Sequence, residues 1–174
     1  MLDFDHLDHE RFMREALKEA EQARREGERP IGAVVVCNGE VVGRGRAQHK
    51  ARHSRVAHAE MNALIQSEQY VRDHLHECAV YTTVEPCVMC LGAIVMSDID
   101  CIVFALADHW IEPATLMHND YVRRHVKHYL GGVLEAESAA LWEKADPAEL
   151  YMLRTGSRWG DAHSRAARDR ESGA

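Results

Sequence analysis

Several features are missing from this 174-residue sequence, and each absence narrows the class of protein. No segment comes near the roughly 18 to 20 uninterrupted apolar residues that a membrane-spanning helix needs. The polar residues 1–6 lack the basic and then apolar layout of a secretory signal peptide. Membrane and secreted classes are therefore disfavoured, and we expect a cytoplasmic protein.

Cysteine is also sparse, with five residues in the whole chain. Two of them form a C-x-x-C sequence, which fits metal thiolates in a reducing compartment better than a disulfide framework. We interpret the other three, Cys37, Cys78 and Cys101, as small apolar side chains. The composition does not change before residue 155, so we expect a single domain over residues 1–154 and a mobile tail over residues 155–174.

An excess of positive charge is absent as well, because 21 Lys and Arg stand against 28 Asp and Glu and the net charge is −7. A broad nucleic-acid-binding face needs Lys and Arg clustered over a whole surface. The one basic stretch contains no acid, and its members are Arg44, Arg46, Lys50, Arg52 and Arg55. We favour a solvated loop for this stretch, and the alternative is a gate whose cations meet one phosphate of a substrate.

Two short motifs supply three candidate metal ligands and one further acid. His58-Ala59-Glu60 is followed by a C-x-x-C sequence formed by Cys87 and Cys90. Imidazole and thiolates are zinc ligands, and three protein ligands leave the fourth position of a catalytic zinc to water. Glu60 is placed to exchange protons with that water, so we predict one Zn²⁺ on His58, Cys87 and Cys90, with Glu60 as general acid/base.

The alternative is a structural zinc site that closes with a fourth protein ligand. Cys78, Cys101 or another histidine would supply that ligand, and the protein would then be a non-catalytic, zinc-stabilised interaction module. Such a site has no use for Glu60 two residues from the histidine. We therefore favour the catalytic interpretation.

Hydrophobic periodicity and turn residues predict alternating helices and strands. Asn38-Gly39 joins two β-branched runs and is typical of a hairpin turn. We expect helices near residues 12–23, 58–65, 86–96, 115–126 and 137–144, a helical turn to 153, and strands at residues 31–37, 41–43, 78–83, 99–106 and 128–134. This order predicts an α/β protein, a three-layer α/β/α sandwich with a mixed five-stranded sheet.

The motifs and the segments 30–36, 42–45 and 81–94 resemble the zinc-dependent cytidine deaminase superfamily, over about residues 8–145. The similar branch contains guanine deaminase, fungal-type cytosine deaminase and the tRNA adenosine deaminases. The resemblance implies a cytidine deaminase-like fold and hydrolytic replacement of a ring amine by a carbonyl with release of ammonia. It also implies a homodimer.

The resemblance extends to a predicted substrate pocket. Asp108 matches an acid that helps to choose the base in related deaminases, and Trp110 is placed to stack on a flat ring, with an ordinary packed tryptophan in a turn as the alternative. Ala59 and Glu85, which flank the ligand motifs, are expected in the same pocket. Relatives commonly carry an asparagine after the second strand, where this chain has Arg46-Ala47-Gln48, and we expect Gln48 to substitute for it.

Three functional hypotheses remain open. We favour deamination of a small base or nucleoside, guanine-like or cytosine-like, because an acidic surface repels a polyanion and because residues 110–115 replace the glycine-rich loop usual in tRNA deaminases. The second hypothesis is a tRNA adenosine or nucleotide deaminase, and the third is the non-catalytic zinc module. Interaction with a membrane is not expected.

Overall fold

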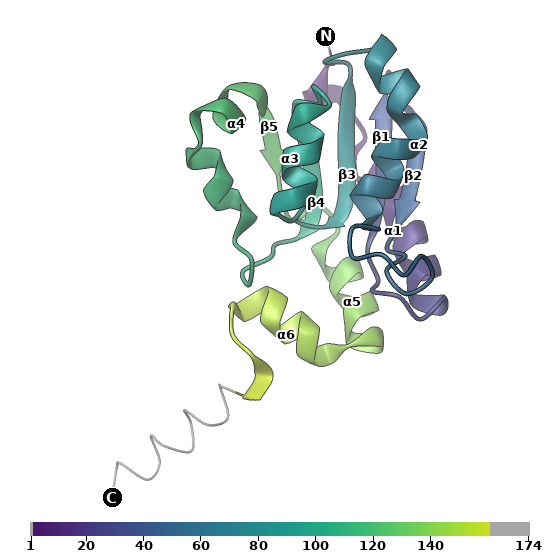
Figure 1. The fold of residues 1–174 in the computed structure, drawn as a ribbon, viewed down its shortest axis with the longest axis vertical. Coiled ribbons are helices and arrows are strands. Elements are labelled where there is room, and N and C mark those ends of the chain that lie inside the picture. The colour runs from purple at the N-terminus through teal and green to yellow at the C-terminus, as the bar shows by residue number, and fades with distance from the viewer. Residues whose placement is uncertain (1, 161–174) are drawn as a thin grey trace, which may run out of the picture.

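The computed structural model describes residues 2–160, in which helices cover both faces of a five-stranded sheet (Figure 1). The strands are β1 (Gly32–Cys37), β2 (Glu40–Arg46), β3 (Cys78–Val84), β4 (Cys101–Leu106) and β5 (His128–Leu130), and their order across the sheet is β2-β1-β3-β4-β5. β1 pairs antiparallel with β2 and β3, whereas β3, β4 and β5 run parallel. The predicted mixed sheet is confirmed.

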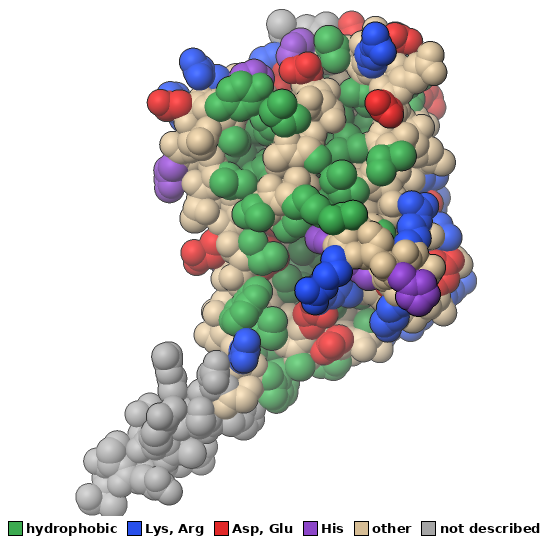
Figure 2. Space-filling view, in the orientation of Figure 1, with side chains coloured by type: hydrophobic (Ala, Val, Ile, Leu, Met, Phe, Trp, Pro, Cys, Tyr) green, Lys and Arg blue, Asp and Glu red, His purple; other side chains and the backbone are tan. Residues whose placement is uncertain are grey.

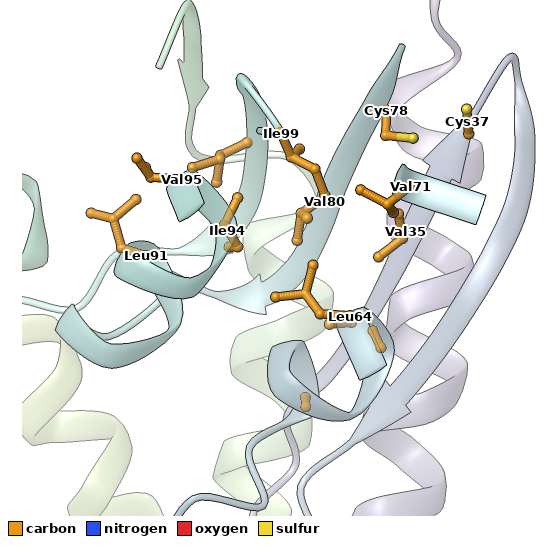
Figure 3. Close-up of a cluster of buried hydrophobic side chains, with 14 residues drawn as sticks. Val35, Cys37, Leu64, Val71, Cys78, Val80, Leu91, Ile94, Val95 and Ile99 are labelled. Carbon is orange, nitrogen blue, oxygen red and sulfur yellow. The ribbon is translucent and has the colours of Figure 1, made fainter. Parts of the chain in front are cut away.

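The two faces of β1 bury different helices because successive side chains of a strand point to opposite sides of the sheet. Val35 and Cys37 pack in the cluster that includes α2 (Ala59–Asp73) and α3 (Val88–Met96), part of which Figure 3 shows. Val34 and Val36 pack against α1 (His9–Arg25), and α5 (Glu135–Ala145) lies on the same side as α1. This arrangement is the predicted three-layer α/β/α sandwich.

The remaining helices are short and lie at the edges of the sandwich. They are the 3-10 turns η1 (Phe4–His6) and η2 (Pro113–His118) and the helices α4 (Asp120–His125) and α6 (Pro147–Thr155). None of the helices in the described residues is long and apolar enough to cross a membrane. The predicted domain boundary at residue 154 stays a prediction, and most of the predicted tail, residues 161–174, lies outside the described residues.

Local signals account for the elements that were predicted correctly and for those that were not. Asn38 and Gly39 take the positive φ angles of 50° and 77° that the hairpin turn requires. The helix predicted over residues 115–126 was wrong in extent, because the side chain of Asn119 accepts hydrogen bonds from the amides of Tyr121 and Val122 and starts a new helix there. The last strand ends at Leu130 instead of residue 134, since Gly132 has a φ of 86°.

Candidate active site

The first functional element is the start of α2. His58 is the N-cap in an extended conformation, and Glu60 lies in the first helical turn. This end of α2 packs closely on β2: a Cβ added to Gly45 would lie 2.1 Å from the carbonyl oxygen of Ala59 and 2.4 Å from the amide of Ala63. A glycine at position 45 therefore lets the helix approach the strand and fixes the position of both functional side chains.

The second functional element is the start of α3, where Cys87 is the N-cap and Cys90 lies in the first turn. The Sγ atoms of Cys87 and Cys90 lie 3.6 and 3.5 Å from Nδ1 of His58. The N-termini of α2 and α3 thus converge on one point. Their positive dipole ends stabilise thiolates and other anions placed there.

These three donor atoms fit a zinc ion. Zinc–sulfur bonds of about 2.3 Å and zinc–nitrogen bonds of about 2.0–2.1 Å at a tetrahedral angle place sulfur and nitrogen about 3.6 Å apart. The observed 3.5 and 3.6 Å agree with that separation. Within residues 2–160, no other His, Cys, Asp or Glu joins this cluster. Cys78 and Cys101 begin β3 and β4, at the opposite end of the sheet, so neither closes the site as a fourth ligand.

Hydrogen bonds set the protonation of the two thiols. The hydrogen bond with Cys90 lowers the pKa of Cys87 to about 4, and the same bond raises the pKa of Cys90. The hydrogen bond with Cys87 also raises the pKa of His58. Of the three donors, Cys87 is therefore the one that loses its proton most readily, and a metal ion displaces the protons that Cys90 and His58 hold.

Glu60 lies beside the ligands and is buried, with 3% of its surface exposed. Thr82 of β3 donates a hydrogen bond of 3.0 Å to its Oε1. Burial raises the pKa of the Glu60 carboxyl group. A fixed carboxyl group with a raised pKa accepts a proton more readily than an ordinary carboxylate and can return it, which is the property of a general acid/base.

The ligands open onto a cavity of about 220 Å³ at the C-terminal ends of β3 and β4. This volume is below the roughly 300–1,000 Å³ of drug-sized ligand sites, and it suits one flat ring. Four predicted substrate-binding residues line the cavity: Ala59, Glu85, Asp108 and Trp110. Trp110 is 44% exposed at its edge, and the guanidinium of Arg158 lies 5.8 Å from its ring centre, so Trp110 is not a packed core residue.

Glu85 and Asp108 shape the cavity floor through hydrogen bonds. Glu85 accepts one from the Asp108 amide at 2.9 Å and one from the Tyr129 hydroxyl at 2.7 Å. Oδ1 of Asp108 accepts from the amides of Trp110 and Ile111, and burial raises the pKa of this carboxyl group. Glu85 thus positions Asp108, and Asp108 holds the turn that carries Trp110.

Gln48 is not brought into the cavity. Neighbouring side chains of an extended segment point in opposite directions, and Ala47 is the residue that lines the cavity. Oε1 of Gln48 lies 3.5 Å from the side-chain nitrogen of Asn62, in a separate hollow with Arg52. The structure thus places Gln48 outside the cavity and Ala47 in its wall, and the expectation that Gln48 takes the role of the relatives' asparagine stays a prediction.

Two charged cavity residues escaped the sequence analysis. Arg29, before β1, forms an ion pair of 2.7 Å with Glu149 of α6, and both line the cavity. Burial raises the pKa of Glu149. Helix α6 docks through a hydrogen bond of 2.8 Å from the His109 amide to the Leu153 carbonyl. No local motif marks these residues, because they meet only when α6 folds over the sheet.

Most members of the basic stretch are engaged by neighbouring residues, and two of them are paired with acids. Arg44 pairs with Glu15, Arg46 pairs with Glu26, and Arg52 donates to Asn62. Arg55 forms no ion pair within the described residues, and it lines a hollow of about 580 Å³ that adjoins the cavity. The two hollows share the side chains of Arg29, His49, His58, Trp142 and Glu149. Lys50 lines the same hollow as Arg55, but its ammonium group donates a hydrogen bond to the Gly27 carbonyl. Of the two members of the basic stretch that line this hollow, Arg55 is therefore the one that is placed to meet a substrate.

Comparisons with known proteins agree with this geometry. The family model for the cytidine and deoxycytidylate deaminase zinc-binding region matches residues 7–106. The tRNA-specific adenosine deaminase of Bacillus subtilis (strain 168) is 36% identical over 140 residues, which cover 76% of this chain and 84% of that protein. The tRNA-specific adenosine deaminase of Aquifex aeolicus is 36% identical over 100 residues, or 57% of this chain and 66% of that protein.

Solved structures have the same fold. A structure from a study of A-to-I editing by tRNA:A34 deaminases superimposes with a TM-score of 0.68 at 29% identity, over 75% of this chain and 98% of that one. Guanine deaminase from Nitrosomonas europaea gives a TM-score of 0.70 at 23% identity, over 80% and 85% of the two chains, and at that identity the likeness concerns the fold alone. The predicted cytidine deaminase-like fold is confirmed.

Proposed function

The chain belongs to the family of zinc-binding cytidine and deoxycytidylate deaminases, and from this premise we propose that it converts adenosine to inosine in transfer RNA. The observation that carries the proposal is the 36% identity with a tRNA-specific adenosine deaminase over three-quarters of the chain. This choice corrects the preference for a small base, which was based on acidic composition and on residues 110–115. The more general prediction of a zinc-dependent hydrolytic deaminase does not depend on which substrate is correct.

His58, Cys87 and Cys90 would hold the zinc ion. When bound, zinc supplies a Lewis acid that brings the pKa of water towards neutrality. Glu60 accepts a proton as water adds to the ring carbon that carries the amine, and returns it to a ring nitrogen. A second proton then passes through Glu60 to the departing amine, which leaves as ammonia. The hydrogen bond from Thr82 keeps the carboxylate aimed during both transfers.

Arg55 adds a reason to prefer an RNA substrate over a free base. A nucleotide whose base enters the 220 Å³ cavity leaves its phosphates outside, and the adjoining 580 Å³ hollow presents Arg55 with no carboxylate partner in the described residues. An unpaired guanidinium is a suitable phosphate ligand. We therefore assign Arg55 to a substrate phosphate.

The test compares substrates with the zinc-loaded protein. A tRNA transcript with adenosine at the wobble position, free adenosine, guanine and cytosine are incubated separately, and inosine or ammonia is measured. We expect inosine in the tRNA and little product from the free compounds. Faster ammonia release from a free base than from tRNA contradicts the substrate assignment and leaves the deaminase assignment intact.

One observation favours a small base as the second candidate. Helix α6 covers the cavity and places Glu149 and Met152 in its wall, which restricts the entry of a polymer. A free base of the guanine or cytosine type needs no wider entrance. The same set of substrates decides between the two candidates.

We also infer a homodimer through the outer surfaces of α2 and α3. Figure 2 shows hydrophobic side chains gathered over these helices, and exposed Ile65, Val88 and Met96 belong to them. An exposed apolar patch of this kind marks an interaction surface. Light scattering after size-exclusion chromatography should give twice the chain mass, and an Ile65→Glu, Met96→Glu variant should be monomeric.

A further inference from the structure

A second group of metal-binding side chains lies at the other end of the sheet. Cys37 ends β1 and Cys78 begins β3, and the two are direct partners in the antiparallel register. Figure 3 shows both sulfur atoms at this end of the core. His74 is the C-cap of α2, and Glu77 immediately precedes β3. Three side chains with metal-binding atoms, Cys37, His74 and Glu77, therefore come together from the end of β1 and the turn between α2 and β3.

The distances in this group suit a single ion. The ligand atoms of Cys37, His74 and Glu77 all lie within 4.8 Å of one another, as do those of the active-site cluster. Nδ1 of His74 lies 3.2 Å from Oε2 of Glu77. Sulfur, imidazole nitrogen and carboxylate oxygen are the three donor types that zinc accepts. The thiol of Cys78, the strand partner of Cys37, donates a hydrogen bond of 3.7 Å to the His74 carbonyl, so it lies next to the group without being one of its three ligands.

Backbone and side-chain contacts hold these donors before any ion arrives. The amide of Glu77 donates to the His74 carbonyl at 3.1 Å and closes the turn. The side chain of Asn38 donates to Glu77 at 3.4 Å, so the hairpin turn also orients the carboxylate. Cys37 is fully buried, whereas the side chains of His74 and Glu77 are 35% and 37% exposed. An ion from solvent thus reaches the thiol through the two exposed ligands.

We propose that Cys37, His74 and Glu77 bind a second divalent cation of the zinc class. Binding forms a metal–sulfur bond at Cys37 and releases the proton of its thiol to solvent. None of the cavities described above is lined by these three residues, so no substrate pocket adjoins the site. The site is therefore structural.

The consequence is a helix anchored by metal at both ends. α2 begins beside His58 and ends at His74, and its 15 residues span about 22 Å at 1.5 Å per residue. The second ion would join the end of α2 to β1 and β3. Because an ion that binds only the folded chain stabilises it, the melting temperature should rise with zinc concentration after the active site is saturated.

The test counts ions in the full chain. Protein stripped with a chelator is reloaded with Zn²⁺, dialysed and analysed by elemental mass spectrometry. We expect about two ions per chain in the wild type and about one in His74→Ala and in Glu77→Gln, which change half-exposed ligands. His125→Ala, a partly exposed histidine on α4, is the matched control and should retain both ions. Deaminase activity should be unchanged in all three variants.

Two further measurements make the result specific. Cys87→Ser should lose the active-site ion and retain the second, and wild-type protein loaded with Co²⁺ should absorb more strongly in the thiolate charge-transfer region than Cys37→Ser. One ion per chain in the wild type, or a second ion that His74→Ala retains, overturns the proposal. A Cys37–Cys78 disulfide in the freshly purified protein, detected by mass before and after reduction, also overturns it.

Discussion

The two ends of α2 present similar ligands in different surroundings. At the His58 end, two helix N-termini converge, a buried carboxyl group lies beside the ligands, and a 220 Å³ cavity opens at the site. At the His74 end, the helix C-terminus faces the group, and its negative dipole end favours a cation without activating a water molecule. Metal ligands alone therefore do not make a site catalytic, because catalysis also needs a cavity for the substrate and a buried group that carries protons.

The pKa values of the cysteine thiols also differ between the two ends of α2. The hydrogen bond with Cys90 lowers the pKa of Cys87 to about 4, whereas burial raises the pKa of Cys37 and of Cys78. The His58 end of α2, the active end, thus keeps one thiolate, Cys87, without an ion, although the pKa of Cys90 is raised there too. At the His74 end, the distal end, both thiols stay neutral until an ion displaces a proton. Zinc should therefore bind the active end first.

The largest expected effect distinguishes Glu60, at the His58 end of α2, from Glu77, at the His74 end. Glu60→Gln should lower kcat by about 10²- to 10⁴-fold, the usual contribution of a general acid/base, with zinc retained. Glu77→Gln is the matched control and should leave kcat unchanged. Steady-state rates of inosine formation and zinc content measure both effects. Comparable losses of kcat in the two variants would show that position 60 has no special chemical role.

The next prediction concerns the packing of α2 against β2 at the His58 end. Gly45→Ala places a methyl group 2.1 Å from the Ala59 carbonyl, and backbone atoms cannot rotate away. We expect a loss of about 1–3 kcal/mol in the free energy of unfolding and weaker zinc binding at the active end. Gly92→Ala is the control, since its added Cβ meets nothing within 4 Å and α3 gains a better helix former. Denaturant unfolding and zinc titration measure the change. A Gly45→Ala protein as stable as Gly92→Ala would exclude tight contact between β2 and α2.

The sequence allowed the active end to be predicted because its signals are local. His58 and Glu60 are two residues apart, Cys87 and Cys90 are three apart, and each pair shares a helix start. The hairpin turn was equally local. These features need no knowledge of which strands become neighbours.

Features that depend on long-range contacts were missed. Arg29 and Glu149 meet because α6 docks over the cavity, and the path of the chain after β2 brings Ala47 instead of Gln48 into the cavity wall. Cys37 and Cys78 were interpreted as apolar, since only the pairing of β1 with β3 brings them together. The group at the His74 end of α2 could therefore be recognised only once the order of the strands in the sheet was known.

Arg55 tests a smaller effect at the active end. Arg55→Gln should lower kcat/KM for the tRNA substrate by about 2- to 5-fold, the value of one exposed charge contact, and should reduce the salt dependence of binding by about one phosphate contact. Arg44→Gln is the control, because Arg44 is paired with Glu15 on α1. Both variants should act on free adenosine as the wild type does. An equal response of Arg44→Gln and Arg55→Gln would favour the solvated-loop interpretation.

The smallest expected effect concerns the ion pair between Arg46 of the basic stretch and Glu26 at the end of α1. Hydrogen bonds from Arg46, at 2.9 and 3.0 Å, lower the pKa of the Glu26 carboxyl group. A lowered carboxyl pKa contributes stability that is present above the ordinary value of 4.5 and is lost as pH falls through the folded-state pKa. Glu26→Gln should therefore lower the melting temperature slightly at pH 7, and the difference from wild type should shrink as pH falls below about 4.

Glu68→Gln is the control for this measurement, because Glu68 is exposed on α2 and forms no ion pair within the described residues. Its melting temperature should follow the wild type at every pH, measured by circular dichroism between pH 3 and 7. A Glu26→Gln difference that stays constant across this range would mean that the Arg46 contact does not depend on the charge of Glu26. The basic stretch would then be held by β2 alone, and the ion pairs with α1 would contribute little to the stability of the structure around His58.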